Sequence, residues 1–393
     1  MKIEYIAKFC WPNISGAARV TTEIAKGLAE RGHQITVLIP NSDYEHMTGK
    51  GSVPAIPAGC NILYWGPRLS GFAASTISYL ILLLKAVPLG FKSNVILGHY
   101  HHSNLAGFCA AVTSWVCRKP LVLRTDDVVA VPSTLMDTLL CFALRWCTWL
   151  SFRQAKLVLV SGNEQGDIIE KLYGLRPEKV VTSYNGVDCA EFNPGNRSEA
   201  LRHKLGSEHI VVFSGELSFE RGVDLLIRAL ALIKPSYHDI KVIVLGDGPD
   251  LSRLIDLATT LGVSESIEFI GPVNPWLVPT YLASSDVAIG PLRALPQTYG
   301  TTPLKIVEYM ASGPVVITGA GTVSARLIVD NLNGLLFQSG DVEDLARAIL
   351  EAFSDEHIAE RLSRNARDTA KKFYEWKNIV SELEAKLRLV SNL

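Results

Sequence analysis

A loop of small residues leads directly into a predicted helix that carries a single acid. Gly300-Thr301-Thr302-Pro303 precedes the helix, Glu308 lies about one and a half turns inside it, and Gly313-Pro314 ends it. A helix N-terminus behind such a loop offers free N–H groups and the positive end of the helix dipole, which suit a phosphate. The Glu308 carboxylate could then reach sugar hydroxyls beside that phosphate. The stretch therefore predicts a site for a nucleotide or a nucleotide sugar.

Polar clusters follow two other predicted strands where those strands end. Gly98-His99-Tyr100-His101-His102 follows one, and Arg124-Thr125-Asp126-Asp127 follows the other. Ligands of open α/β sheets bind at the carboxyl ends of strands, so both clusters are candidate site residues. Asp126 and Asp127 could equally cap the next segment. Consecutive histidines do not converge on a metal as histidines at i and i+4 of a helix do, so we expect no metal site.

Short apolar runs alternate with predicted helices along both halves of the chain, which is typical of parallel sheets with helical crossovers. The predicted strands are 2–6, 35–39, 95–97, 121–123, 157–160 and 180–184 in the first half, and 210–213, 241–245, 267–270, 287–289 and 315–317 in the second. A polar stretch with Pro and Gly at 189–208 is the best linker. We therefore predict an α/β protein with a doubly wound parallel sheet in each half. Gly246-Asp247-Gly248-Pro249 lacks the third glycine of a dinucleotide fingerprint and predicts only a tight turn.

Composition narrows the possible partners and compartment. The chain has 38 Lys and Arg against 39 Asp and Glu, so no overall field attracts nucleic acid. Its seven cysteines are scattered without a CxxC pair, which favours reduced thiols in a cytoplasmic protein over disulfides or a zinc site. Residues 1–6 lack the apolar core of a secretion signal.

Two long apolar stretches stand out, at 72–91 and 134–152. Each contains charged residues, such as Lys85 and Arg145, that a membrane-spanning helix would hold at a high energetic cost. We favour two buried or half-buried helices of a large domain. The alternative is peripheral contact with a membrane surface, in which Trp and Arg side chains act as interfacial anchors.

Five segments, spread in order over nearly the whole chain, together resemble the retaining, family-4 type of GT-B glycosyltransferases. They are the small-residue loop at 12–18 with Arg31–Val37, Asn185–Asp188, Gly215–Asp224, Val244–Pro249 and Lys305–Val316. The resemblance implies two Rossmann-like domains that face each other across a cleft. Residues 1–188 would hold the acceptor, residues 189–370 would hold a nucleotide-sugar donor, and a C-terminal helix in residues 371–393 would cross back to the N-terminal domain.

The resemblance also implies site residues. Glu308 would bond the ribose hydroxyls, the backbone of Thr301–Leu304 would line the diphosphate and sugar, and Arg221 stands where the family has a phosphate-binding Lys. The predicted donor-binding residues are Gly16, Ala17, Glu216, Arg221, Gly271, Thr301, Thr302, Pro303, Leu304, Lys305 and Glu308, and the predicted catalytic residues are Asp126 and Arg221. No metal or other cofactor is implied, because cationic side chains and helix ends would stabilise the leaving diphosphate.

Three polar positions depart from the family pattern. Gly300 stands where the family has a second Glu, Glu216 where an arginine is expected, and Asp126 where a histidine is common. The Glu216 carboxylate would repel a diphosphate unless it pairs with Arg221 or contacts sugar hydroxyls.

The expected activity is transfer of a sugar from a nucleotide-diphosphate sugar to a glycan or lipid-linked acceptor in cell-surface polysaccharide or glycolipid synthesis. The expected location is the cytoplasm, with the inner face of the plasma membrane as an alternative. Two other functions stay open. A catalytically silent nucleotide-sugar-binding protein would fit the three departures, and a nucleotide-sugar 2-epimerase would need more acid and base residues than the sequence offers.

Overall fold

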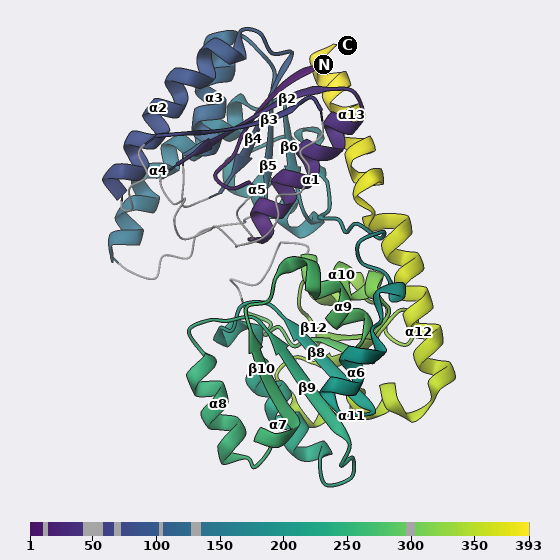
Figure 1. The fold of residues 1–393 in the computed structure, drawn as a ribbon. Coiled ribbons are helices and arrows are strands. Elements are labelled where there is room, and N and C mark those ends of the chain that lie inside the picture. The colour runs from purple at the N-terminus through teal and green to yellow at the C-terminus, as the bar shows by residue number, and fades with distance from the viewer. Residues whose placement is uncertain are drawn as a thin grey trace. The chain divides into compact units, whose positions relative to one another are not determined.

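The computed structural model describes residues 1–10, 15–41, 58–66, 72–101, 105–126, 135–295 and 303–392. They form two compact units (Figure 1). Unit 1 holds the described residues of Met1–Asn185 and Trp376–Leu393, and unit 2 holds those of Gly186–Tyr299 and Pro303–Glu375. The predicted boundaries after residues 188 and 370 compare with divisions after Asn185 and Glu375.

The centre of unit 1 is a parallel sheet with the strand order β3-β2-β1-β4-β5-β6-β7. The strands are β1 (Lys2–Ile6), β2 (Gln34–Pro40), β3 (Cys60–Trp65), β4 (Val95–Tyr100), β5 (Leu121–Thr125), β6 (Leu157–Val160) and β7 (Val180–Thr182). The order reverses between β1 and β4, and their carboxyl ends are the usual place for a ligand in such a sheet. Strand β3, which the sequence did not predict, lies at one edge.

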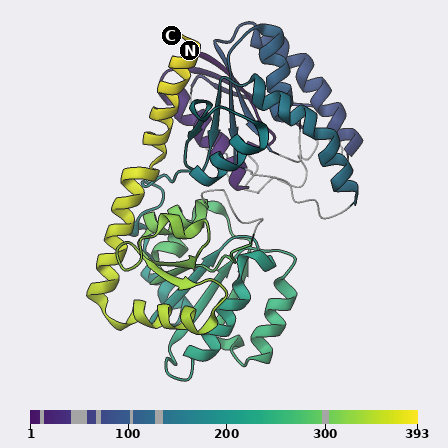
Figure 2. The ribbon, with the colours of Figure 1, turned by 180° about the vertical axis from the view of Figure 1, so that it is seen from behind.

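Helices cover both faces of this sheet. The helices are α1 (Gly16–Glu30), α2 (Phe72–Gly90), α3 (Ala106–Cys117), α4 (Leu135–Gln154), α5 (Asn163–Tyr173) and α13 (Trp376–Ser391). Figures 1 and 2 show α2, α3 and α4 on one side of the sheet and α1 with α13 on the other. Among the described helices, none has the length and apolarity that a membrane crossing needs.

Helix α13 follows unit 2 in the sequence but packs within unit 1. Its Val380 contacts α1 where Gly27 leaves room: a Cβ at Gly27 would lie 2.9 Å from Val380 Cγ2. Glu384 Oε1 lies 3.0 Å from Nε2 of His33, which stands in the turn between α1 and β2. Helix α13 is therefore a structural part of unit 1.

Unit 2 repeats the architecture with a parallel sheet in the order β10-β9-β8-β11-β12-β13. The strands are β8 (His209–Ser214), β9 (Ile240–Leu245), β10 (Ile267–Gly271), β11 (Val287–Gly290), β12 (Val315–Ala320) and β13 (Leu335–Gln338). The helices are α6 (Glu199–Leu205), α7 (Val223–Ile233), α8 (Leu251–Thr260), α9 (Val278–Ala283), α10 (Leu304–Ser312), α11 (Val342–Ser354) and α12 (Glu356–Thr369).

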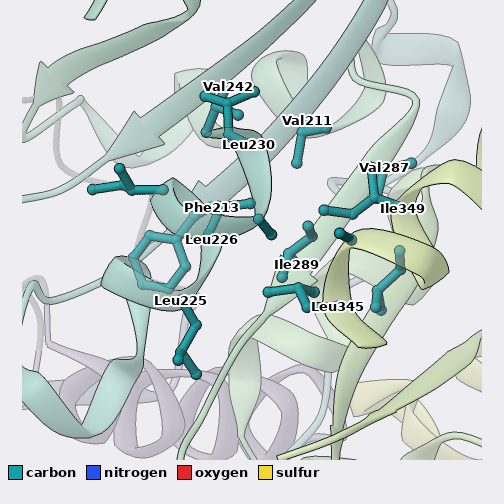
Figure 3. Packing of buried hydrophobic residues seen from close by; sticks show 14 of the residues in the cluster. Val211, Phe213, Leu225, Leu226, Leu230, Val242, Val287, Ile289, Leu345 and Ile349 are labelled. Carbon is teal, nitrogen blue, oxygen red and sulfur yellow. The ribbon is translucent and has the colours of Figure 1, made fainter. Parts of the chain in front are cut away.

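The core of unit 2 explains why its strands read as unbroken apolar runs. Residues of the central strands, such as Val211 and Ile289, pack against Leu226 of α7 and Leu345 of α11 (Figure 3). Strands covered by helices on both faces bury every side chain, so the alternation of apolar and polar residues disappears. Each half of the chain therefore contains the predicted doubly wound parallel sheet.

Candidate functional site

Helix α10 is held at the carboxyl edge of the unit 2 sheet. It begins at Leu304 after Pro303, whose backbone is extended, and ends at Gly313, whose φ is +107°. The Tyr309 hydroxyl accepts a hydrogen bond from Ser214 N at 2.8 Å and donates one to Ser214 O at 3.2 Å. These two bonds fix α10 to the end of β8. Gly300, Thr301 and Thr302 of the predicted phosphate loop lie outside the described residues.

Two cations line a small hollow at this edge. Its lining residues are Phe213, Arg221, Gly290, Pro291, Leu292, Pro303, Lys305 and Ser324. Three predicted donor-binding residues, Arg221, Pro303 and Lys305, are thus brought together. An anion seated here would meet both positive side chains and the first turn of α10.

Lys305 is held in an unusual environment for an ammonium group. Its Nζ lies 4.3 Å from the centroid of the Phe213 ring. Burial, and next the charge of Arg221, lower its pKa to about 7, although the carboxylates of Glu308 and Glu216 oppose the shift. A Cβ at Gly215, where φ is +141°, would lie 2.5 Å from Nζ. A side chain at 215 would therefore displace this ammonium group.

Glu216 pairs with Arg221 across 3.8 Å. We expected the Glu216 carboxylate to repel a diphosphate unless it paired with Arg221 or contacted sugar hydroxyls. The structure shows the pairing with Arg221. Glu308 is half-buried on α10, one helical turn after Lys305, so acid and cation share one face of the helix.

Arg293 fixes the turn that carries Arg221, and sequence reasoning did not identify it. Its guanidinium donates two hydrogen bonds to the Asp224 carboxylate, each 2.8 Å long, and a third to Phe219 O at 2.6 Å. Burial alone would raise the pKa of Asp224, but the hydrogen bonds and charge of Arg293 outweigh it and lower that pKa. A basic residue just after the end of β11 was the signal available in the sequence.

Glycines let the neighbouring loops approach each other backbone to backbone. A Cβ at Gly246 would lie 2.0 Å from Gly215 O, and one at Gly248 would lie 2.3 Å from Leu217 O. The segment is the predicted tight turn. Gly271, at the end of β10, accepts a hydrogen bond from Gly246 N at 2.8 Å and does not line the hollow.

In unit 1, Asp126 belongs to a buried polar network at the carboxyl ends of β4 and β5. Its Oδ1 accepts a hydrogen bond from Arg124 at 3.2 Å, and its Oδ2 lies 2.9 Å from His99 Nε2. Arg124 is fully buried and also donates to Ser183 O at 3.1 Å and to Asn185 Oδ1 at 2.6 Å.

The network holds the Asp126 carboxylate ionised. Burial would raise its pKa, but the charge of Arg124 and the hydrogen bond and charge of His99 keep that pKa well below its ordinary range. Both carboxylate oxygens are engaged within the protein, which suits a residue that orients its neighbours. Asp127 and His102 lie outside the described residues.

Gly16 and Ala17 are the first two residues of α1, not part of a loop. Ser15 caps this helix, because its side chain accepts a hydrogen bond from Ala18 N at 3.3 Å. Gly16 is exposed and Ala17 is partly exposed.

Comparisons with known proteins agree with this arrangement. Residues 14–191 match the family model described as Glycosyltransferase Family 4, and residues 198–369 match that described as Glycosyl transferases group 1. The chain is 25% identical to an uncharacterized glycosyltransferase of Methanocaldococcus jannaschii over 97% of this chain and 96% of that protein. It is 23% identical to the N-acetyl-alpha-D-glucosaminyl L-malate synthase of Bacillus anthracis over 95% and 94% of the two chains.

A solved structure shares the fold. HepE of Anabaena, in complex with UDP-glucose, superposes with a TM-score of 0.76 at 23% identity over 99% of this chain and 100% of that chain.

Proposed function

This chain belongs to the GT4-type glycosyltransferases of the GT-B fold, and from that premise we propose that it is a retaining enzyme that needs no metal ion. It transfers a sugar from a nucleotide-diphosphate sugar to a glycan or lipid-linked acceptor. The observation that carries the proposal is the pair of cations, Arg221 and Lys305, in one hollow beside the N-terminus of α10.

The chemistry of that hollow suits a leaving diphosphate. In the proposed reaction the acceptor hydroxyl oxygen bonds to the anomeric carbon on the face that the diphosphate leaves. The bond from that carbon to the phosphate oxygen breaks, and the hydroxyl proton passes to the leaving phosphate. Negative charge then grows on the diphosphate, and Arg221, Lys305 and the helix end stabilise it. The Glu308 carboxylate is proposed to accept hydrogen bonds from the ribose.

UDP-sugars are the first donors to test, because HepE of Anabaena was solved with UDP-glucose. The six cysteines that the structure describes in side-chain detail form no disulfide with one another, which fits the cytoplasm as the compartment. Asp126 remains a predicted catalytic residue. Its engaged oxygens support a positioning role on the acceptor side.

The test is turnover by the purified protein. Release of nucleoside diphosphate from a panel of nucleotide sugars and acceptors is measured with and without EDTA, and the anomeric configuration of the product is read by NMR. Arg221→Ala is expected to lower kcat/KM on the order of a hundredfold, as loss of a charged transition-state contact does. Glu308→Ala is expected to raise KM for the donor, because the lost ribose contact is made in the ground state as well as in the transition state. The matched controls are Arg228→Ala on α7 and Glu360→Ala on α12, whose side chains are exposed.

Four results would contradict parts of the proposal separately. Donor binding without turnover across the panel indicates a silent binding protein. An inverted product rejects retention, and loss of activity with EDTA rejects metal independence. Interconversion of the donor without transfer indicates the epimerase.

A further inference from the structure

We propose that the outer surface of α2, α3 and α4 docks on an anionic lipid bilayer. This surface, the α2–α4 face, consists of the exposed residues Ile77, Leu80, Leu84, Lys85, Phe91, Lys92, Trp115, Val116, Arg118, Arg145, Trp146, Trp149, Leu150, Arg153 and Lys156. The three helices lie side by side on one side of unit 1 (Figures 1 and 2). The inference is independent of the donor-site proposal.

The outward side of α2 is apolar where a surface helix is normally polar. Ile77, Leu80 and Leu84 recur at the helical period, Phe91 follows just after the helix ends at Gly90, and Leu84 is 74% exposed. Inward residues of the same helix, such as Leu82, are fully buried in the core of unit 1. The helix is therefore apolar on both sides, and the described part of the chain covers only one of them.

Tryptophans extend this apolar surface onto the neighbouring helices. Trp115 of α3 and Trp146 of α4 are each 71% exposed. Trp146 packs edge-to-face with Trp149, with their ring centroids 5.9 Å apart. An indole ring combines an apolar body with a polar N–H, and such rings gather at the boundary between lipid chains and water.

The charges on this face are almost all positive. Residues 72–92 and 106–119 contain no Asp or Glu, and residues 135–156 contain only Asp137. The cations are Lys85, Lys92, Arg118, Lys119, Arg145, Arg153 and Lys156. In a chain with 38 basic and 39 acidic residues this is a strong local excess. Arg153 also lies over the ring of Trp149, 5.0 Å from its centroid.

The charge pattern selects a bilayer over a second copy of the chain. If two α2–α4 faces met, their cations would be brought together and would repel each other. An anionic bilayer offers both an apolar layer for the Trp and Leu side chains and negative headgroups for the cations. The face therefore fits attachment to a membrane surface with the three helices lying against it.

The test is co-sedimentation of the full chain with vesicles. One set is phosphatidylcholine alone, and the other is an equal mixture of phosphatidylcholine and phosphatidylglycerol. We expect binding to the mixed vesicles that weakens as salt is raised, and little binding to phosphatidylcholine. Arg145→Ser and Lys92→Ser should each weaken binding about fivefold. Leu84→Ser and Trp146→Ser should each weaken it on the order of tenfold.

Matched controls separate this surface from exposed apolar side chains in general. Leu389→Ser, at an 80% exposed position on α13, should bind as the unaltered chain does. Lipids with brominated acyl chains should quench tryptophan fluorescence, and Trp115→Phe with Trp146→Phe should reduce that quenching while the chain still sediments with vesicles.

Three outcomes would overturn the inference. The first is no binding to the mixed vesicles at low salt. The second is binding that the four substitutions leave unchanged while the variants unfold at the temperature of the unaltered chain. The third is a concentration-dependent dimer in analytical ultracentrifugation that Trp146→Ser abolishes, because the face would then cover a second copy.

Discussion

Arg293 shows how a residue outside every recognised motif can control the site. It is the partner of the buried Asp224 carboxylate and holds the turn that ends at Arg221. Arg293→Met should destabilise unit 2 by about 3 kcal/mol, because it leaves a buried carboxylate unpaired. Urea unfolding measures this loss. Arg293→Met combined with Asp224→Asn should recover much of the stability but not donor affinity, since the turn stays unheld. If Arg293→Met alone is as stable as the unaltered chain, this role is refuted.

Lys305 should make donor binding depend on pH. Its pKa is lowered to about 7 in the free protein, and a bound diphosphate would favour its charged form. Above pH 7 binding must therefore take up a proton, so Kd should rise with pH by up to about tenfold per unit. Below that pKa this dependence disappears. Calorimetry with UDP on Lys305→Met should show a flatter profile, whereas the exposed Lys204→Met should match the unaltered chain. Identical profiles for both variants would show that Lys305 takes up no proton.

Glu4 should weaken the fold as pH rises. It is fully buried on β1, and neither carboxylate oxygen has a hydrogen-bond partner among the described residues. Burial raises its pKa from 4.5 to about 8. The unfolded chain therefore releases this proton first, and folded stability falls between those two values, by on the order of 4 kcal/mol in total.

Substitution of Glu4 tests that expectation. The free energy of unfolding of Glu4→Gln minus that of the unaltered chain, measured by urea unfolding, should be larger at about pH 8.5 than at about pH 5.5. Glu30→Gln, at an exposed position on α1, should show no such gain. An unchanged difference at the two pH values would mean that Glu4 does not titrate in this range.

At the scale of elements, the contact between α1 and α13 depends on a missing side chain. Gly27→Ala improves helix propensity by about 1 kcal/mol but places its Cβ against Val380, which costs about 1–3 kcal/mol. We expect a net loss of stability in thermal unfolding, and recovery on adding Val380→Ala. Gly166→Ala in α5 is the control, because its Cβ would meet only ordinary contacts at 3.4 Å. This substitution should stabilise the protein. If Gly27→Ala instead stabilises the protein, α1 and α13 can make room for the added methyl group without a loss of folding free energy.

The sequence predicted elements best where burial is complete. Strands β8 and β11 contain unbroken apolar runs because helices cover both faces of their sheet, and both were predicted. Strands β3 and β13 were missed. Both lie at sheet edges, where fewer neighbours bury the strand and an exposed residue such as Gln338 is tolerated. Within the site, Arg221 and Lys305 were placed by motif. Arg293 was not, because its partner Asp224 is distant in sequence and only the fold brings them together.

At the scale of the whole molecule, α13 ties the stability of unit 1 to residues that follow unit 2. Leu383 is buried in unit 1, so Leu383→Ala should cost about 2–5 kcal/mol and reduce hydrogen-exchange protection of the unit 1 strands. Leu362→Ala on α12 is the matched substitution in unit 2 and should reduce protection there. Loss of protection in unit 2 alone from Leu383→Ala would contradict the division.

The placement of α13 also sets an order of events during synthesis. Unit 1 lacks this helix until residues 186–375 have left the ribosome, which takes roughly 10 to 40 s at about 5–20 residues per second. During that interval the α1 surface around Gly27 has no covering helix, whereas all the described residues of unit 2 lie between Gly186 and Glu375. Unit 2 is thus the first of the two that can finish folding, and the nascent chain carries an incomplete unit 1 until α13 emerges.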